Sequence, residues 1–206
     1  DNNEWAFFLY RKHPVFFPSG VRRMGLVRHD EAVEAAKRLG LSPEQLTFLG
    51  YPDFGTLNIW LRRWGSRKPY RGMLTRATAV PYKNAMRPGA PYKGEEVLQD
   101  LKSVLELFHP TKIFLSHPAD YMPDHLALYL FTRVALWDLE RDMRPELYPY
   151  LVHHGRWPSP EGYHPQLLLE PPPRMEPMIG WQYSPLTTEE VEKKRAALEA
   201  HATQLA

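Results

Sequence analysis

The chain has 206 residues, of which 43% are hydrophobic and 24% charged, an ordinary composition for a globular domain with one core. Its 26 basic and 24 acidic residues give a net charge of +2, which argues against nucleic acid as a partner. Cysteine is absent, so disulfides and thiolate metal ligands are excluded. No apolar run approaches the roughly 20 residues of a membrane span. We therefore predict a single domain over residues 1–206 and a cytoplasmic location, with export left open because the chain starts at Asp1.

The first half of the chain mixes irregular and periodic segments. Residues 1–27 are aromatic and irregular, which predicts a loop, whereas 28–39 carry one small apolar face that is typical of a helix. A helix-start signal at 42–45 predicts a short turn. Residues 46–49 then read as a buried strand, and a short helix is expected near 58–64 between long loops.

In the second half of the chain, predicted helices and strands alternate more clearly. The expected elements, in order, are a helix at 95–108, a strand at 113–116, a helix at 125–139 and a candidate strand at 148–152. Thr187 and Glu190 form a capping box for a last helix, whose inner face is predicted to carry Val191 and Leu198. This alternation favours an α/β fold with a mostly parallel sheet.

Four groups that can bind metals or protons lie between the strand at 113–116 and the following helix. They are His117, Asp120, Asp124 and His125. Active sites in parallel sheets lie just beyond the carboxyl ends of strands, and imidazole and carboxylate groups are ligands for Zn²⁺. The alternative is an ordinary helix start with surface histidines. Spacing alone does not decide between the two.

The same run resembles the second signature of the PIG-L/LmbE deacetylases, roughly His-Pro-x-Asp-x-His-Pro-Asp-His, when one extra residue is allowed. The matching residues are His117, Pro118, Asp120, Pro123, Asp124 and His125. Residues 28–31 resemble the family's Arg-x-x-Glu helix start, 49–53 its Leu-Gly-x-x-Asp strand end, and 194–204 its closing helix. The similarity spans most of residues 28–204.

The resemblance implies a Rossmann-like three-layer α/β sandwich and a zinc-dependent hydrolase. Such an enzyme removes an N-acyl group, typically acetyl, from an amino sugar or glycoconjugate, and one Zn²⁺ per chain is expected in the full-length protein. His125 matches the metal-binding histidine, and Asp124 matches the aspartate that orients or tunes it. Arg28 and Asp53 match positions that face the sugar substrate.

The remaining site residues are assigned by their place in the chain. His117 and Asp120 lie at the mouth of the expected site, and we assign them, with Asp124, to catalysis. His153 and His154 follow the candidate strand at 148–152 and could reach the same site, where we assign His154 to substrate binding. The alternative for this pair is a polar strand end.

Two departures from the family pattern qualify this interpretation. The first signature of the family, His-Pro-Asp-Asp-Glu, does not occur in the chain, so we expect an N-terminal strand–helix segment with further metal ligands to be missing. Met122 stands where the family usually has the first histidine of His-Pro-Asp-His. A catalytically impaired, sugar-binding relative is therefore the alternative. A nucleotide-binding domain is less favoured because no Gly-x-Gly-x-x-Gly motif follows a predicted strand.

Overall fold

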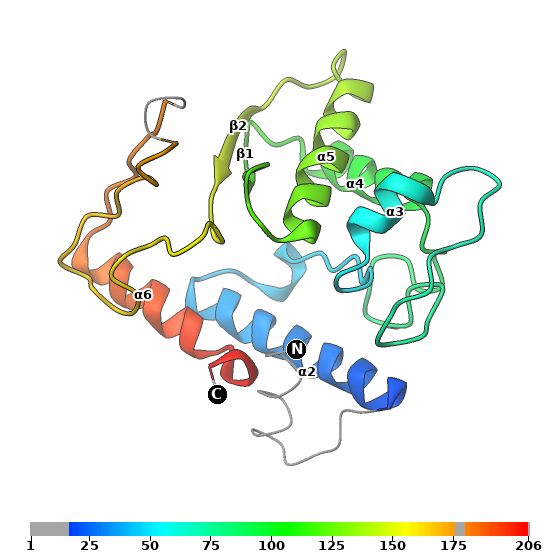
Figure 1. Ribbon diagram of the computed structural model, residues 1–206, viewed down its shortest axis with the longest axis horizontal. Helices are drawn as coiled ribbons and strands as arrows, with labels where there is room; N and C mark the ends of the chain where they lie inside the picture. The colour runs from blue at the N-terminus through cyan, green and yellow to red at the C-terminus, as the bar shows by residue number, and fades with distance from the viewer. Residues whose placement is uncertain (1–16, 176–179, 206) are drawn as a thin grey trace.

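The computed structural model describes residues 17–175 and 180–205 (Figure 1). Its elements, in chain order, are α2 (Pro18–Arg38), η1 (Pro43–Gln45), α3 (Thr56–Arg62), α4 (Gly94–Phe108), β1 (Lys112–Ser116), α5 (Pro123–Asp138), β2 (Glu146–Tyr150), α6 (Thr188–Glu199) and η3 (Ala202–Gln204). None of the helices in these described ranges combines the length and the apolar character that crossing a membrane requires.

The two strands form a parallel pair connected by α5. The register runs from Lys112 opposite Glu146 to Ser116 opposite Tyr150. Parallel strands need a crossover, and α5 provides it as it packs against β1 (Figure 1). The predictions of an α/β fold and of parallel pairing are confirmed, and the described residues form an open sheet of two strands. The first strand lies where the sequence predicts it, whereas the second begins and ends two residues earlier than the predicted 148–152.

Helices α3 and α4 both pack on α5, and the main core lies between them. The α4 prediction is confirmed, and the short helix expected near 58–64 is α3. The ring of Phe131 on α5 is 1% exposed and meets Trp60 and Trp64 at centroid distances of 4.9 and 5.9 Å. A second cluster, which includes Leu105 and Leu139, joins α4 to the end of α5.

Helix α2 is longer than the sequence pattern predicts. It begins at Pro18, so the expectation of a loop through residue 27 is wrong for 18–27, and residues 1–16 lie outside the described residues. Proline suits the first turn of a helix because its missing N–H has no partner there. Val21 and Met24 are buried against Leu74, and this tertiary contact accounts for the extra turns.

The strand predicted at 46–49 is not formed. The segment has no regular secondary structure, and its carbonyl at Phe48 accepts a hydrogen bond from the N–H of Met86 (2.7 Å). A strand requires a paired neighbour, and no described strand runs beside it. Helix α5 begins at Pro123, two residues before the predicted start, so Asp124 and His125 both lie in its first turn.

The C-terminal helix packs against α2, as Figure 1 shows. Its predicted capping box is confirmed, with Thr187 as the N-cap. The predicted inner face is wrong at Leu198, which is 57% exposed, because the close approach of the two helices buries Ala197 against Ala35 instead. Beyond α6, the N–H and hydroxyl of Thr203 donate to the carboxylate of Glu31 on α2 (2.9 and 2.7 Å).

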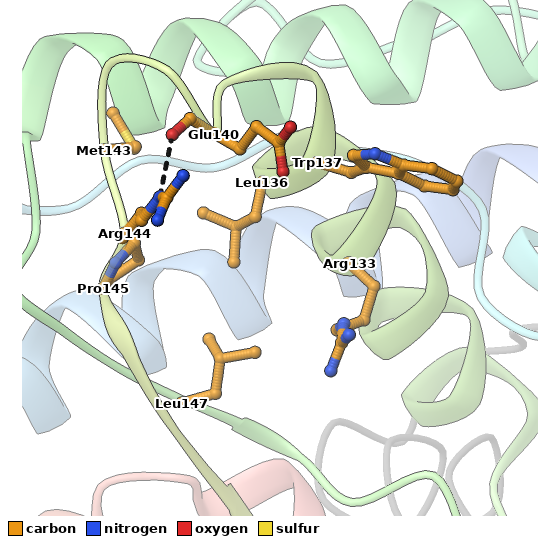
Figure 2. A pocket seen from close by; sticks show the side chains of 8 residues that line it. All are labelled: Arg133, Leu136, Trp137, Glu140, Met143, Arg144, Pro145 and Leu147. Carbon is orange, nitrogen blue, oxygen red and sulfur yellow. Dashed lines mark hydrogen bonds between the residues drawn. The ribbon is translucent and has the colours of Figure 1, made fainter.

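A cavity of about 550 Å³ lies between the end of α5 and the start of β2, and Figure 2 shows the side chains that line it. Its lining includes Arg133, Trp137, Met143 and Leu147, and Arg144 donates a hydrogen bond from Nε to the carbonyl of Glu140 (3.3 Å). Its lining contains none of the histidines or aspartates singled out from the sequence.

Candidate metal centre

The segment between β1 and α5 is tied to the chain that follows β2. The N–H of His117 donates to the carbonyl of Tyr150 (2.8 Å), and the N–H of Tyr121 donates to the carbonyl of His153 (3.0 Å). Because β1 and β2 are parallel, their carboxyl ends meet at the same edge of the sheet. The structure thus brings together two histidine-bearing segments that lie about thirty residues apart in the sequence.

Asp120 lies at the centre of this junction, and its side chain is fully buried. Its carboxylate accepts hydrogen bonds from the backbone N–H groups of Met122 (3.0 Å), Val152 (2.9 Å) and His153 (2.9 Å). Burial alone raises the pKa of a carboxyl group, but here the three amides outweigh it and hold the pKa of Asp120 well below its usual value. The group is therefore a fixed, ionised carboxylate.

Two imidazole rings face this carboxylate. Nδ1 of His125 lies 3.1 Å from Oδ1 of Asp120, and Nδ1 of His153 lies 3.4 Å from the same oxygen. One ligand atom from each of these three residues lies within 4.8 Å of the other two, and the two ring centroids are 5.1 Å apart. The buried Nδ1 of His125 has no hydrogen-bond partner among the described residues.

This donor set fits a metal ion. Two imidazoles and one carboxylate are a known ligand combination for Zn²⁺, with the fourth position open to water or substrate. The unsatisfied Nδ1 of His125 beside an ionised oxygen is costly for a protein interior unless a cation, or a proton on the ring, lies between the two atoms. Asp120, His125 and His153 are therefore the candidate metal ligands of this structure.

Asp124 points away from these ligands and toward the start of α3. Its oxygens accept hydrogen bonds from the N–H groups of Phe54 (2.6 Å) and Thr56 (3.0 Å) and from the Thr56 hydroxyl. The first N–H groups of a helix have no partner within the helix, and an anion satisfies them and the helix dipole. Asp124 thus docks α3 onto the first turn of α5, directly beside His125.

His117 and His154 flank the cluster on the side of Tyr121 and Trp181. Nδ1 of His117 accepts a hydrogen bond from the N–H of Ala119 (3.0 Å), which places the ring proton on Nε2. Desolvation and the neighbouring His154 both lower the pKa of His117, so its ring is neutral at neutral pH. The His117 ring stacks on Trp181 at 6.1 Å, and the His154 ring lies 4.8 Å from Tyr121.

Arg28 and Asp53 line a second part of the same region, a cavity of about 350 Å³ between α2 and the loop before α3. Desolvation lowers the pKa of the Arg28 guanidinium, and the charge of Asp53 opposes this effect. Desolvation and the nearby Asp124 carboxylate raise the pKa of Asp53, and the positive charge of Arg28 opposes this rise. Tyr51 and Tyr82 contribute aromatic walls to the cavity.

From the sequence we gave a role to His154 alone, in substrate binding, although both His153 and His154 were expected to be able to reach the site; the structure places His153 in the ligand cluster. Neighbouring residues at a strand end project in opposite directions, so only one of an adjacent histidine pair can face the carboxylate. The structure turns His153 toward Asp120 and His154 toward Tyr121. The available signal was the position of the pair at the end of a strand parallel to β1.

Comparison with known families identifies the family to which the chain belongs. The family model PIG-L, described as GlcNAc-PI de-N-acetylase, matches residues 10–136, and the chain belongs to this family. The match includes Asp120 and His125 but ends before His153. Neither a search of curated proteins nor a search of solved structures gave a match.

Proposed function

We propose that this protein is a zinc-dependent hydrolase that removes an N-acetyl group from an amino sugar or glycoconjugate. The observation that carries the proposal is the cluster of Asp120, His125 and His153 at the carboxyl ends of two parallel strands. Membership of the PIG-L family supports the deacetylase chemistry. The proposal includes one Zn²⁺ per chain and the three-layer sandwich implied by the family resemblance, with β1 and β2 as part of its sheet.

A zinc ion bound here would polarise the acyl carbonyl and lower the pKa of a bound water molecule. The residues of the chain supply the rest of the proposed mechanism. Asp120 would hold the ion directly through its buried, ionised carboxylate, together with the rings of His125 and His153. Asp124 fixes the first turn of α5 by its hydrogen bonds to α3, and so positions His125 indirectly.

His117 is the proposed hydrogen-bond donor to the oxyanion. Its ring is neutral, its Nδ1 accepts from the backbone, and its Nε2–H remains free to donate a hydrogen bond to the negatively charged oxygen that forms when the acyl carbonyl is attacked. Met122, at the position where the family pattern has a histidine, has no proton to give. His117 is the side chain that we expect to replace it.

The substrate contacts proposed from the sequence fall into two groups. Arg28 and Asp53 line the cavity next to α3, and the carboxylate of Asp53 is close enough to Asp124 for their charges to interact. The ring of His154 lies against that of Tyr121. We propose that Arg28 and Asp53 bind the hydroxyl groups of the sugar and that His154 lies near its outer edge.

The direct test is metal content and deacetylase activity of the full-length protein. Zinc is measured by inductively coupled plasma mass spectrometry, and acetate release is measured with N-acetylglucosamine conjugates. We expect about one zinc per chain in the wild type and loss of both zinc and activity in His125→Ala and His153→Ala. His109→Asn is the matched control, because His109 is exposed at the end of α4 with φ 46°, a conformation that asparagine tolerates.

A catalytically impaired sugar-binding protein is the second candidate, and Met122 at the N-cap of α5 is the observation that favours it. This candidate predicts binding of N-acetylglucosamine conjugates without acetate release, with or without zinc. Acetate release that stops on chelation and returns with added zinc would exclude it. If zinc remains bound after both histidine substitutions, the proposed metal centre is wrong.

A further inference from the structure

The basic residues of this chain are unevenly distributed. Residues 54–94 contain nine of the 26 basic residues and none of the 24 acidic ones. The chain as a whole has a net charge of only +2, so this segment concentrates positive charge that the rest of the chain balances. Like charges repel, and their concentration in one part of a surface attracts anions.

Four of these cations lie together where α3 ends. They are Arg62, Arg63, Arg67 and Lys68. Within the described ranges, none of the four side chains forms an ion pair or a hydrogen bond, and Nε of Arg63 is buried without a partner. Arg87 and Lys93, in the same segment, do have acidic partners: Glu96 and Asp100 for Arg87, and Glu95 for Lys93.

Three of the four line one cavity. The cavity measures about 490 Å³ and is formed by Arg62, Arg63 and Arg67 together with Leu61 and Trp64. The negative end of the α3 dipole attracts cations, but it amounts to only about half a charge. Three guanidinium groups exceed what the helix end can neutralise, so the cavity retains a strong positive potential.

The backbone that carries these arginines is firmly held. The ring of Trp64 packs against Phe131, and it occupies the space where a side chain at Gly94 would otherwise lie. The N–H of Arg67 donates to the carbonyl of Trp64 (3.2 Å), and the N–H of Gly94 donates to the carbonyl of Arg63 (2.8 Å). An anion would therefore meet a preformed turn, which lowers the entropic cost of binding.

We propose that this cavity is a binding site for a phosphate group, as a monoester or diester. The planar fork of a guanidinium matches two phosphate oxygens, and several arginines can surround one such group. A phosphorylated small molecule and a phospholipid headgroup share this chemistry. The site uses none of the candidate metal ligands, so it stands independently of the proposed hydrolase activity.

The test is calorimetric titration of the full-length protein with pyrophosphate, in the presence of a chelator so that the metal centre does not contribute. We expect binding that the double variant Arg62→Ala/Arg67→Ala weakens at least about tenfold, which corresponds to losing one hydrogen bond to a charged group. The variant Arg62→Lys/Arg67→Lys keeps the positive charge but lacks the planar guanidinium groups that can each bind two phosphate oxygens. We therefore expect it, too, to bind pyrophosphate more weakly than the wild type does. Arg141→Ala, at an exposed arginine beyond α5, is the matched control.

A second arm distinguishes the two sources of phosphate. Sedimentation with phosphatidylcholine vesicles, with and without phosphatidic acid, is measured for the same variants. Binding to the acidic vesicles that both double variants reduce would assign the site to a lipid headgroup, whereas pyrophosphate binding without vesicle binding would assign it to a soluble phosphate ester. Absence of both, or affinities equal in the wild type and both double variants, would overturn the proposal.

Discussion

Replacing Asp120 with asparagine should destabilise the protein even when no metal is bound. The wild-type carboxylate accepts three backbone hydrogen bonds, one at Oδ1 from Met122 and two at Oδ2 from Val152 and His153. The single carbonyl oxygen of asparagine can keep two of these, while its NH₂ group must face the third N–H. One charge-assisted hydrogen bond is lost and a buried donor is left unpaired, which costs about 2–4 kcal/mol in the free energy of unfolding.

The assay is urea unfolding of both proteins in a chelator, followed by tryptophan fluorescence. For a chain of this size, the loss corresponds to a fall in Tm of roughly 5–15 °C. Asp142→Asn is the matched control, because Asp142 is exposed and its side chain has no described partner, and we expect a change below about 0.5 kcal/mol. A difference below about 1 kcal/mol for Asp120→Asn would refute the role assigned to these hydrogen bonds.

The loss of stability caused by Asp120→Asn should depend on pH. The folded-state pKa of Asp120 lies below its usual value of 3.8, so its contribution to stability is complete above that value. As the pH falls below about 4, the unfolded state binds a proton that the folded state does not, and this contribution declines. The difference in unfolding free energy between the wild type and Asp120→Asn should therefore shrink below pH 4. A difference that stays constant would contradict the lowered pKa of Asp120.

Three further substitutions test how the site is held in place. Asp124→Ala should cost about 1–3 kcal/mol and speed hydrogen exchange in the first turn of α3; unchanged exchange would show that this docking is unimportant. Glu31→Gln weakens the hydrogen bonds to Thr203 and should speed hydrogen exchange at the Thr203 amide, whereas an exchange rate equal to that of the wild type would argue against the tether. Gly94→Ala places a methyl group against the Trp64 ring and should lower stability by about 1–3 kcal/mol, measured as the urea midpoint.

The local pattern of the sequence was sufficient for several elements. Helix α4 and strand β1 were predicted to within about one residue, because hydrophobic spacing and β-branched or aromatic runs report which face is buried. The capping box at Thr187 located the start of α6, since this motif is satisfied by residues only three apart. The concentration of histidine and aspartate after β1 likewise located the candidate site.

Contacts between distant segments decided the rest. Residues 46–49 have the composition of a strand, but a strand also needs a neighbour, and a neighbour is a property of the fold. Leu198 is exposed although it is apolar, because the close packing of α6 on α2 selects the small side chain of Ala197. His153 approaches Asp120 only because β1 and β2 are parallel and in register. The sequence therefore determined which groups are available for chemistry, while strand pairing and helix docking decided which of them meet, since distances across a sheet do not follow from distances along the chain.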